Sequence, residues 1–236
     1  MSQEQLFFST DRTIRQKVIQ YLSGFVTEQR LQKITSVLAL RTRYVTVVVE
    51  DLFQTQNISA VLRTCECHGV QDVHIIENEN EFQVHNAISL GANKWLSLHH
   101  YNSDGNRARN CIAHLKEKGY TVVATLPNDD SLFLDELPFN QPTAFLFGTE
   151  LKGLSPELIA LADKTVKIPM YGFTESLNIS NSVAIILSDF VKKIRKSDFN
   201  ISLSEEEKEI LLLEWLQKSI KMSQLLIEKF LQDIIH

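Results

Sequence analysis

The chain has 236 residues, of which 44% are hydrophobic and 22% charged, and its formal net charge at pH 7 is −5. This composition is typical of a globular protein that can bury a sizeable core. The acidic balance argues mildly against nucleic acid as a partner. The charge is uneven, however, because residues 1–43 carry seven basic and three acidic side chains. A local basic surface for a polyanion therefore remains compatible with the sequence.

Cysteine usage and the N-terminal residues bear on the compartment. The three cysteines have no zinc-like or Cys-x-x-Cys spacing, which predicts reduced thiols and no metal site. Glu4, Asp11 and Arg12 occupy the region where an export signal needs an apolar core, and no apolar run approaches the roughly 18 residues of a membrane span. We therefore expect a cytoplasmic protein with no membrane contact.

The N-terminal part of the chain is predicted to be helical. Apolar residues recur at helical spacing over 11–23 and 27–40, so residues 1–43 should form a helical arm. The pattern then changes to YVTVVVE (44–50), a β-branched run typical of a strand that is buried on both faces.

Strands and helices alternate from this point to about residue 196. We expect strands over 72–76, 94–98, 120–126, 142–148 and 165–170, and helices over about 58–68, 106–118, 155–162 and 177–195. Such alternation predicts an α/β domain with a parallel sheet over 44–196. After it, Ser204 to Glu207 reads as a capping box, and helices should fill the segment 197–236.

A parallel sheet binds ligands at the carboxyl ends of its strands. The loop 51–57 contains no glycine, so it cannot form a dinucleotide or phosphate-binding loop. Polar residues instead collect after three strands, in NISAVLRT (57–64), FGTELKGLS (147–155) and IPMYGFTESLNIS (168–180). The alternative for the first segment is a purely structural role, in which Asn57 caps a helix and Arg63 is exposed to solvent. Helix capping explains only one or two of the polar side chains in the third segment, so the three loops together predict a composite site.

These segments resemble the SpoU (TrmH-like) RNA 2′-O-ribose methyltransferases of the SPOUT superfamily. The matching residues are Asn57, Ile58, Ala60 and Arg63, then Phe147, Gly148, Glu150, Gly153, Leu154 and Ser155, then Ile168, Pro169, Met170, Gly172, Ser176, Leu177, Asn178 and Ser180. The residues before the first motif, and helices at both ends, look most like the tRNA guanosine methyltransferase branch. One departure is Asn181-Ser182-Val183, where the family usually has Val-Ala-Ala.

The resemblance implies S-adenosylmethionine as the methyl donor and a sheet whose C-terminal part is threaded into a deep trefoil knot, which general rules make rare. It also implies a set of cofactor-binding residues, which act largely through backbone groups. They are Thr125, Leu126, Gly148, Ile168, Met170 and Leu177. At Gly148 we expect a Cβ atom to obstruct the ligand.

The implied catalytic set is Arg63, Asn57, Glu150, Ser176 and Asn178. A guanidinium is a poor proton acceptor because its ordinary pKa exceeds about 12. We therefore expect Arg63 to hold an RNA phosphate beside the reacting ribose, while the other four orient Arg63 and the ribose.

The predicted reaction is 2′-O-methylation of a tRNA ribose, most simply that of guanosine-18 in the D loop. RNA phosphates are expected to contact the basic arm through Arg12, Arg15, Arg41 and Arg43. The resemblance further implies a homodimer in which Arg63 approaches the partner's cofactor pocket. A ribosomal RNA 2′-O-methyltransferase, and a non-catalytic RNA-binding protein with the same fold, are the alternatives.

Overall fold

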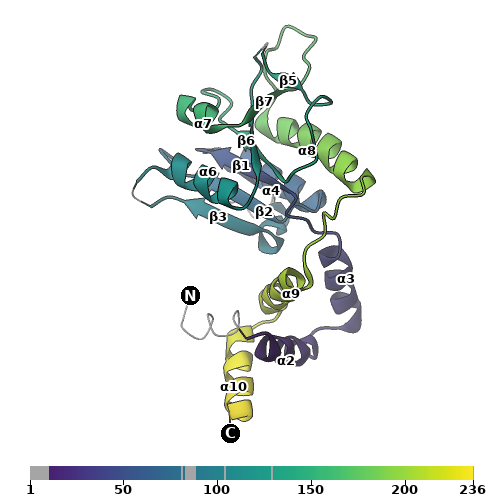
Figure 1. The fold of residues 1–236 in the computed structure, drawn as a ribbon. Coiled ribbons are helices and arrows are strands. Elements are labelled where there is room, and N and C mark those ends of the chain that lie inside the picture. The colour runs from purple at the N-terminus through teal and green to yellow at the C-terminus, as the bar shows by residue number, and fades with distance from the viewer. Residues whose placement is uncertain (1–10, 81, 83–88, 104, 129, 236) are drawn as a thin grey trace. The chain divides into compact units, whose positions relative to one another are not determined.

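The computed structural model describes residues 11–80, 82, 89–103, 105–128 and 130–235 (Figure 1). The chain divides into two compact units, one made of the segments up to Arg41 and from Ser202, the other of Thr42–Ile201. The segments at the two ends, predicted as a separate arm and tail, thus belong to one helical unit. Residues 1–10 of the predicted arm lie outside the described part of the chain.

The larger unit is built on a seven-stranded parallel sheet with the order β3-β2-β1-β6-β4-β7-β5. The strands are β1 (Val45–Glu50), β2 (Asp72–Ile76), β3 (Ser97–Tyr101), β4 (Thr121–Thr125), β5 (Leu132–Phe133), β6 (Thr143–Phe147) and β7 (Lys164–Lys167). This arrangement confirms the predicted α/β class and parallel sheet. The interior strand β1 pairs with β2 on one side and with β6, the middle strand of the sheet, on the other.

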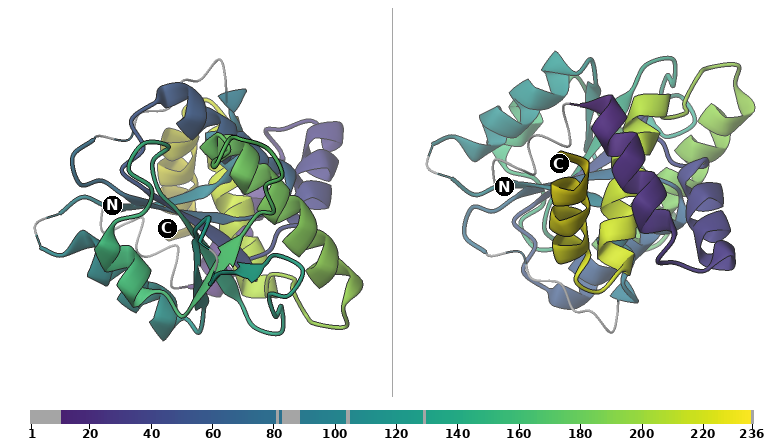
Figure 2. Two further views of the ribbon diagram at one scale, coloured as in Figure 1. Left: turned by 90° about the horizontal axis from the view of Figure 1, so that it is seen from above. Right: turned by 90° about the horizontal axis from the view of Figure 1, so that it is seen from below.

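Helices cover both faces of this sheet (Figures 1 and 2). The helices α4 (Thr55–Cys67) and α8 (Ile179–Lys196) pack on one face, and α6 (Arg107–Glu117) and α7 (Pro156–Leu161) pack on the other. Alternate residues of β1 face the two helical layers. Val47 packs in the core with α4 and α8, and Val48 packs in the core with α6 and α7. Burial on both faces explains the β-branched run.

The structure corrects two predicted boundaries and adds one strand that was not predicted. The expected strand over 94–98 is instead a 3₁₀ turn, η1 (Ala92–Trp95), which follows Gly91 at φ 79°, and the strand β3 begins only at Ser97. The two-residue edge strand β5 is too short to give a sequence pattern. Helix α4 begins at Thr55 with Gln54 as its N-cap. Asn57 therefore lies inside the first turn rather than at the cap, and its side chain is available to other partners.

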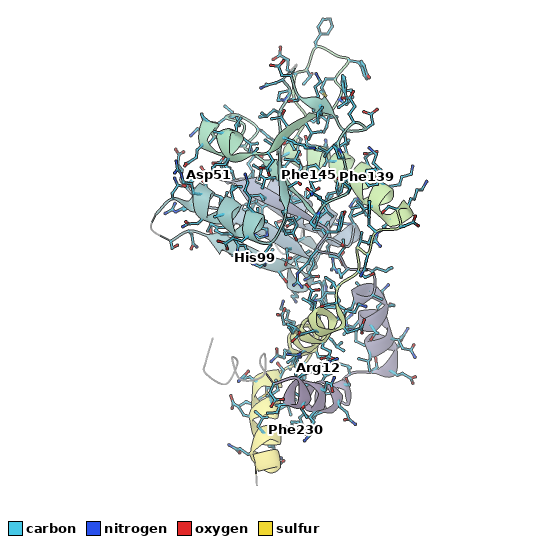
Figure 3. All side chains as sticks on the ribbon, in the orientation of Figure 1. Arg12, Asp51, His99, Phe139, Phe145 and Phe230 are labelled. Atoms are coloured by element: carbon cyan, nitrogen blue, oxygen red, sulfur yellow. The ribbon has the colours of Figure 1, made fainter. Side chains whose placement is uncertain are left out.

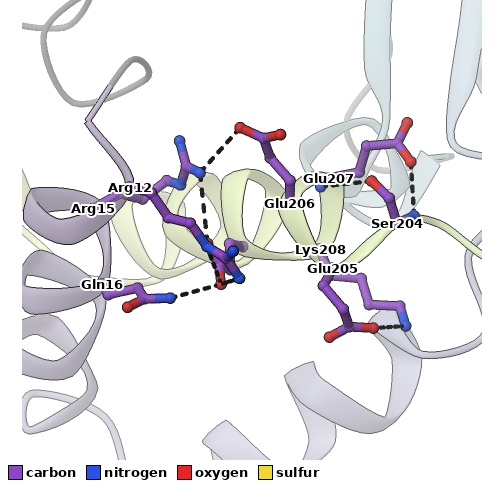
Figure 4. Close-up of polar contacts among 9 residues, drawn as sticks. Arg12, Arg15, Gln16, Ser204, Glu205, Glu206, Glu207 and Lys208 are labelled. Carbon is purple, nitrogen blue, oxygen red and sulfur yellow. Dashed lines mark hydrogen bonds and ion pairs between the residues drawn. The ribbon is translucent and has the colours of Figure 1, made fainter.

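The smaller unit consists of α2 (Arg12–Ser23), α3 (Glu28–Leu38), α9 (Glu205–Ser219) and α10 (Ser223–Ile235). The predicted capping box is confirmed, because the Ser204 hydroxyl accepts the Glu207 N–H at 3.2 Å and the Glu207 carboxylate accepts the Ser204 N–H at 2.8 Å (Figure 4). Among the described helices, none is long and apolar enough to cross a membrane.

His74 on β2 is a buried titratable group in the larger unit. It is 2% exposed, its Nδ1 lies 3.0 Å from the Tyr101 hydroxyl, and its ring stacks on that of His99 with centroids 4.6 Å apart. Burial, followed by the nearby His99, lowers the pKa of His74 to about 3. The folded protein therefore keeps His74 neutral at a pH where the unfolded chain protonates it.

This difference predicts an acid-side loss of stability. As the pH falls from 6.5 toward about 3, the unfolded chain binds a proton that folded His74 does not bind, so the free energy of unfolding should decrease. One such group contributes up to about 1.4 kcal/mol per pH unit. Urea unfolding over this range should show a shallower pH dependence for His74→Phe than for the wild type, and parallel profiles would contradict the assignment.

Candidate active site

A cavity of about 240 Å³ lies at the carboxyl ends of β4, β6 and β7. All of the predicted cofactor-binding residues line it, namely Thr125, Leu126, Gly148, Ile168, Met170 and Leu177. They come from the segments that follow these three strands, which are far apart in the sequence. Glu150 and Ser176 of the predicted catalytic set line the same cavity.

The reason for glycine at position 148 differs from the one expected. A Cβ on Gly148 would lie 2.1 Å from the carbonyl carbon and oxygen of Gly153 and 2.3 Å from the Leu154 nitrogen. The missing side chain thus allows the loop after β6 to fold back on its own start, rather than only making space for a ligand. Mutual backbone hydrogen bonds between Thr149 and Gly153, at 3.1 and 2.9 Å, close the loop. We call residues 148–155 the Glu150 loop.

Three side chains of the predicted catalytic set form a hydrogen-bonded cluster. Glu150 Oε1 accepts the Asn57 Nδ2 at 2.9 Å and also accepts a hydrogen bond from Asn178 Nδ2. The Asn178 Nδ2 donates as well to Asn57 Oδ1 at 3.1 Å. We call Asn57, Glu150 and Asn178 the polar network. It joins one residue from each of the three polar segments, as the composite site requires.

The orientation of the Asn178 amide follows from its second role as the N-cap of α8. Its Oδ1 accepts the backbone N–H of Ser180 at 2.9 Å and the Ser180 hydroxyl at 2.5 Å. Because a backbone N–H can only donate, the carbonyl oxygen must face the helix, and the amide nitrogen must face Glu150. One side chain therefore caps a helix and joins the polar network. The Ser182 hydroxyl donates to the backbone carbonyl oxygen of Asn178 at 3.3 Å.

Arg63 is not brought into this cluster. It lies six residues after Asn57 on α4, which places it about 120° around the helix from Asn57. Its side chain is exposed and forms no hydrogen bond or ion pair with the residues that the structure describes. Within one chain, Arg63 is thus a solvated cation and not a member of the polar network.

Two of the four arginines expected to bind RNA are buried in the helical unit. Arg15 and Arg41 are each 1% exposed, so their expected phosphate contacts are not available in this structure. Arg15 pairs with Glu206 (Figure 4) and with Glu209. Arg41 lies over the Trp215 ring at 5.2 Å. Both have structural roles that a charge count along the sequence does not reveal.

The other two arginines are more accessible but paired. Arg12 binds Glu209 in a bidentate fashion, with an Nη2–Oε1 distance of 2.8 Å (Figure 4). Hydrogen bonds from Arg12 and from Gln16 lower the pKa of Glu209 to about 2. Arg43, in the larger unit, donates to Asp72 at 2.8 Å.

The match to a family model covers residues 44–188 and is described as the SpoU rRNA Methylase family. The chain belongs to this family. The match spans the whole parallel sheet, the Glu150 loop and most of α8, and it therefore contains the cavity and the polar network of this SpoU methylase.

Known proteins are similar over most of the chain. A tRNA (guanosine(18)-2′-O)-methyltransferase of Borreliella burgdorferi is 43% identical over 220 residues, covering 93% of this chain and 97% of the relative. The crystal structure of an A. aeolicus TrmH/SpoU tRNA modifying enzyme has a TM-score of 0.74 at 30% identity, covering 82% of this chain and 98% of that chain. The SpoU methyltransferase AviRb of Streptomyces viridochromogenes, solved with the cofactor AdoMet, shares the fold at a TM-score of 0.57 and 23% identity, covering 69% and 65%.

Some residues of the cavity were not singled out by sequence. Lys167 and Glu175 bring two charges to its lining, and Ser182, noted only as a departure from the family pattern, lines it as well. Lys167 ends β7 directly before Ile168, so its place at the carboxyl end of a strand was the available signal. Among the residues that the structure describes, no cluster of three or more His, Cys, Asp or Glu side chains could hold a metal ion.

The geometry at Gly148 predicts an unusually large effect of one methyl group. We expect Gly148→Ala to lower the free energy of unfolding by about 1–3 kcal/mol, because the Glu150 loop must shift to admit the Cβ. Gly172→Ala is the matched control, since its Cβ would meet nothing closer than 4.0 Å. Chemical unfolding should leave Gly172→Ala close to the wild type, and equal effects of the two substitutions would refute this account.

Proposed function

We propose that this SpoU methylase transfers a methyl group from S-adenosylmethionine to the 2′ oxygen of guanosine-18 in the D loop of tRNA. The observation that carries the proposal is the polar network, which joins one residue of each family motif and has Glu150 in the cavity lining. The substrate follows from the relative that is 43% identical over 97% of its own length and is named for this reaction.

The family resemblance implies that S-adenosylmethionine binds in a bent conformation. The cavity volume of about 240 Å³ lies just below the roughly 300–1,000 Å³ of common ligand pockets, so part of the cofactor would extend beyond it. Backbone groups of the segments after β4, β6 and β7 would hold the adenine. Lys167 and Glu175 offer opposite charges to the carboxylate and ammonium of the methionyl end.

Bound there, S-adenosylmethionine supplies an electrophilic methyl group on a sulfonium. The chain must then align the ribose oxygen with that methyl and assist the loss of a weakly acidic proton. Glu150, Asn57 and Asn178 orient the ribose, and Ser176 lines the cavity together with Glu150. Arg63 holds the neighbouring RNA phosphate as a fork, and that phosphate or a water accepts the proton.

We further propose a homodimer that packs through the face beside the polar network. Leu151, Tyr171 and Phe173 are 89%, 96% and 108% exposed. Leu151 also lines a small hollow together with Asn57 and Glu150. Such apolar exposure next to a polar site is typical of an interface, and a partner there would shield the polar network from water. The partner would also supply the Arg63 that each single chain keeps away from its own network.

The remaining features of the proposal rest on the family. A deep trefoil knot in the segment from β6 to α8 would bring the Glu150 loop and residues 168–178 around one cofactor, which agrees with their shared cavity. Arg12 and Arg43 stay candidates for phosphate contacts, in competition with their carboxylate partners. A tRNA-modifying enzyme of this kind would work in the cytoplasm.

The reaction can be tested with labelled S-adenosylmethionine and unmodified tRNA transcripts. We expect label in 2′-O-methylguanosine at position 18, and none in a matched tRNA that carries 2′-deoxyguanosine there, because the acceptor oxygen is missing. Transfer to ribosomal RNA fragments but not to tRNA would favour the rRNA alternative. Cofactor binding without transfer to any RNA would favour a non-catalytic RNA-binding protein.

The dimer proposal predicts complementation between two inactive chains. Arg63→Ala should keep S-adenosylmethionine binding and lose most methyl transfer, whereas Leu177→Trp should fill the cavity and lose cofactor binding. A purified heterodimer of the two should regain up to about half of the wild-type rate, since a two-fold dimer then has one complete site of two. A verified heterodimer that stays inactive would show that Arg63 acts within its own chain.

A further inference from the structure

Two adjacent carboxylates, Glu50 and Asp51, end strand β1 at the sheet edge that carries the cavity and the polar network (Figure 3 labels Asp51). Neither belongs to the catalytic or cofactor-binding sets discussed above. Glu50 is only 4% exposed, and Asp51 has a φ of 56°. Residues other than glycine rarely adopt this left-handed conformation, and such strain tends to occur near functional sites.

Glu50 holds the far end of the Glu150 loop. Its Oε2 accepts the backbone N–H of Ser155 at 2.8 Å, and its Oε1 accepts the Asn78 Nδ2 at 3.3 Å. Ser155 is the last residue of the loop and the N-cap of α7. Removing the Glu50 carboxylate would leave the donors of a part-buried site without their acceptor, which is more costly than losing an exposed hydrogen bond.

Asp51 organises a second segment, residues 78–80. Its Oδ1 accepts the backbone N–H groups of Asn78, Glu79 and Asn80 at 3.1, 2.8 and 2.8 Å. Three successive N–H groups that converge in this way form a nest for an anion, and here the anion is the chain's own carboxylate. Glu79 then pairs with Lys152 in the Glu150 loop at 2.8 Å. The segment 78–80 is therefore linked to the loop by an ion pair whose side chains are 69% and 73% exposed.

The position of Glu150 depends on these contacts. The loop leaves the sheet at β6, is closed by the hydrogen bonds between Thr149 and Gly153, and is fixed at its end by Glu50. We propose that Glu50 and Asp51 are positioning residues for methyl transfer, which hold the Glu150 loop where its carboxylate meets Asn57 and Asn178. This inference rests on the proposed function, because the reaction it concerns is the transfer to tRNA.

Substitutions at Glu50 test the first half of the inference. Glu50→Ala should raise the Kd for S-adenosylmethionine and lower kcat, by up to about 100-fold, because small displacements of a catalytic group are costly. The Kd for tRNA should stay unchanged. Glu50→Gln should restore most of kcat. The amide oxygen of the new side chain can accept the Ser155 N–H, and its amide nitrogen can donate to Asn78 once the Asn78 amide has turned its oxygen toward it.

Substitutions at Asp51 separate the nest from the backbone strain. Asp51→Gly adopts the positive φ without strain but removes the acceptor, whereas Asp51→Asn keeps an acceptor and tolerates this φ. We expect Asp51→Gly to lower kcat at least tenfold and Asp51→Asn to stay within about threefold of the wild type, in keeping with the displacement argument. A role limited to backbone conformation would instead leave Asp51→Gly fully active.

Asp163→Ala is the matched control, because Asp163 accepts the Val122 N–H at 2.8 Å near the amino-terminal end of β4, away from the cavity. It should lower stability while kcat and the cofactor Kd stay at their wild-type values. Folded Glu50→Ala and Asp51→Gly variants with wild-type kcat and cofactor Kd would overturn the inference. If Glu50→Ala does not fold, Glu50→Gln and the two Asp51 variants decide the matter by the same measurements.

The outcome also separates this inference from the proposed function. A wild-type protein that methylates no tRNA refutes the proposed function. The Kd for S-adenosylmethionine, measured by calorimetry on the same variants, would still show whether Glu50 and Asp51 hold the Glu150 loop in position. Unchanged Kd values would refute this positioning role as well.

Discussion

The Glu150 carboxylate accepts amide hydrogen bonds from Asn57 and Asn178, which lie 93 and 28 residues away in the sequence. This interaction connects the first turn of α4, the Glu150 loop and the N-terminus of α8. Hydrogen bonds to a charged group contribute about 1.5–3 kcal/mol each when they are shielded, and much less in water. The single chain leaves them exposed. Shielding by RNA, cofactor or a second chain would therefore strengthen the contacts that assemble the site.

The need to bring three segments together at Glu150 explains why small residues surround the polar network. Gly148 is needed because the loop folds back within 2.1 Å of where its Cβ would be. Asn178 caps α8 and also donates to both Glu150 and Asn57. An amide provides this combination, whereas a carboxylate has no donor and a hydroxyl has only one. The crowding of Ser and Asn after residue 175 thus serves helix capping and site geometry together, with Ser180 and Ser182 completing the cap.

The sequence was sufficient for the α/β class and the parallel sense of the sheet, because β-branched runs alternate with helical patterns. The residues that line the cavity were implied by the family resemblance and not by local patterns. The sequence failed where the outcome depends on tertiary partners. Arg15 and Arg41 read as surface charges, yet their pairing with Glu206, Glu209 and Trp215 buries them. The sequence allowed Asn57 to be a helix cap, but α4 begins at Thr55 and Asn57 lies in its first turn. The contacts of Glu50 and Asp51 join segments far apart in the chain, and no local pattern records them.

The claim that Asn57, Glu150 and Asn178 act as one unit is tested most directly by a double-mutant cycle. The kcat/KM for tRNA methylation would be measured for Asn57→Ala, Asn178→Ala and the double variant. We expect the double variant to lose little more than the worse single variant, with a coupling energy of at least about 1 kcal/mol, as found for residues within one hydrogen-bond network. Losses that simply add, within about 0.5 kcal/mol, would show that the two asparagines act independently and would contradict the account.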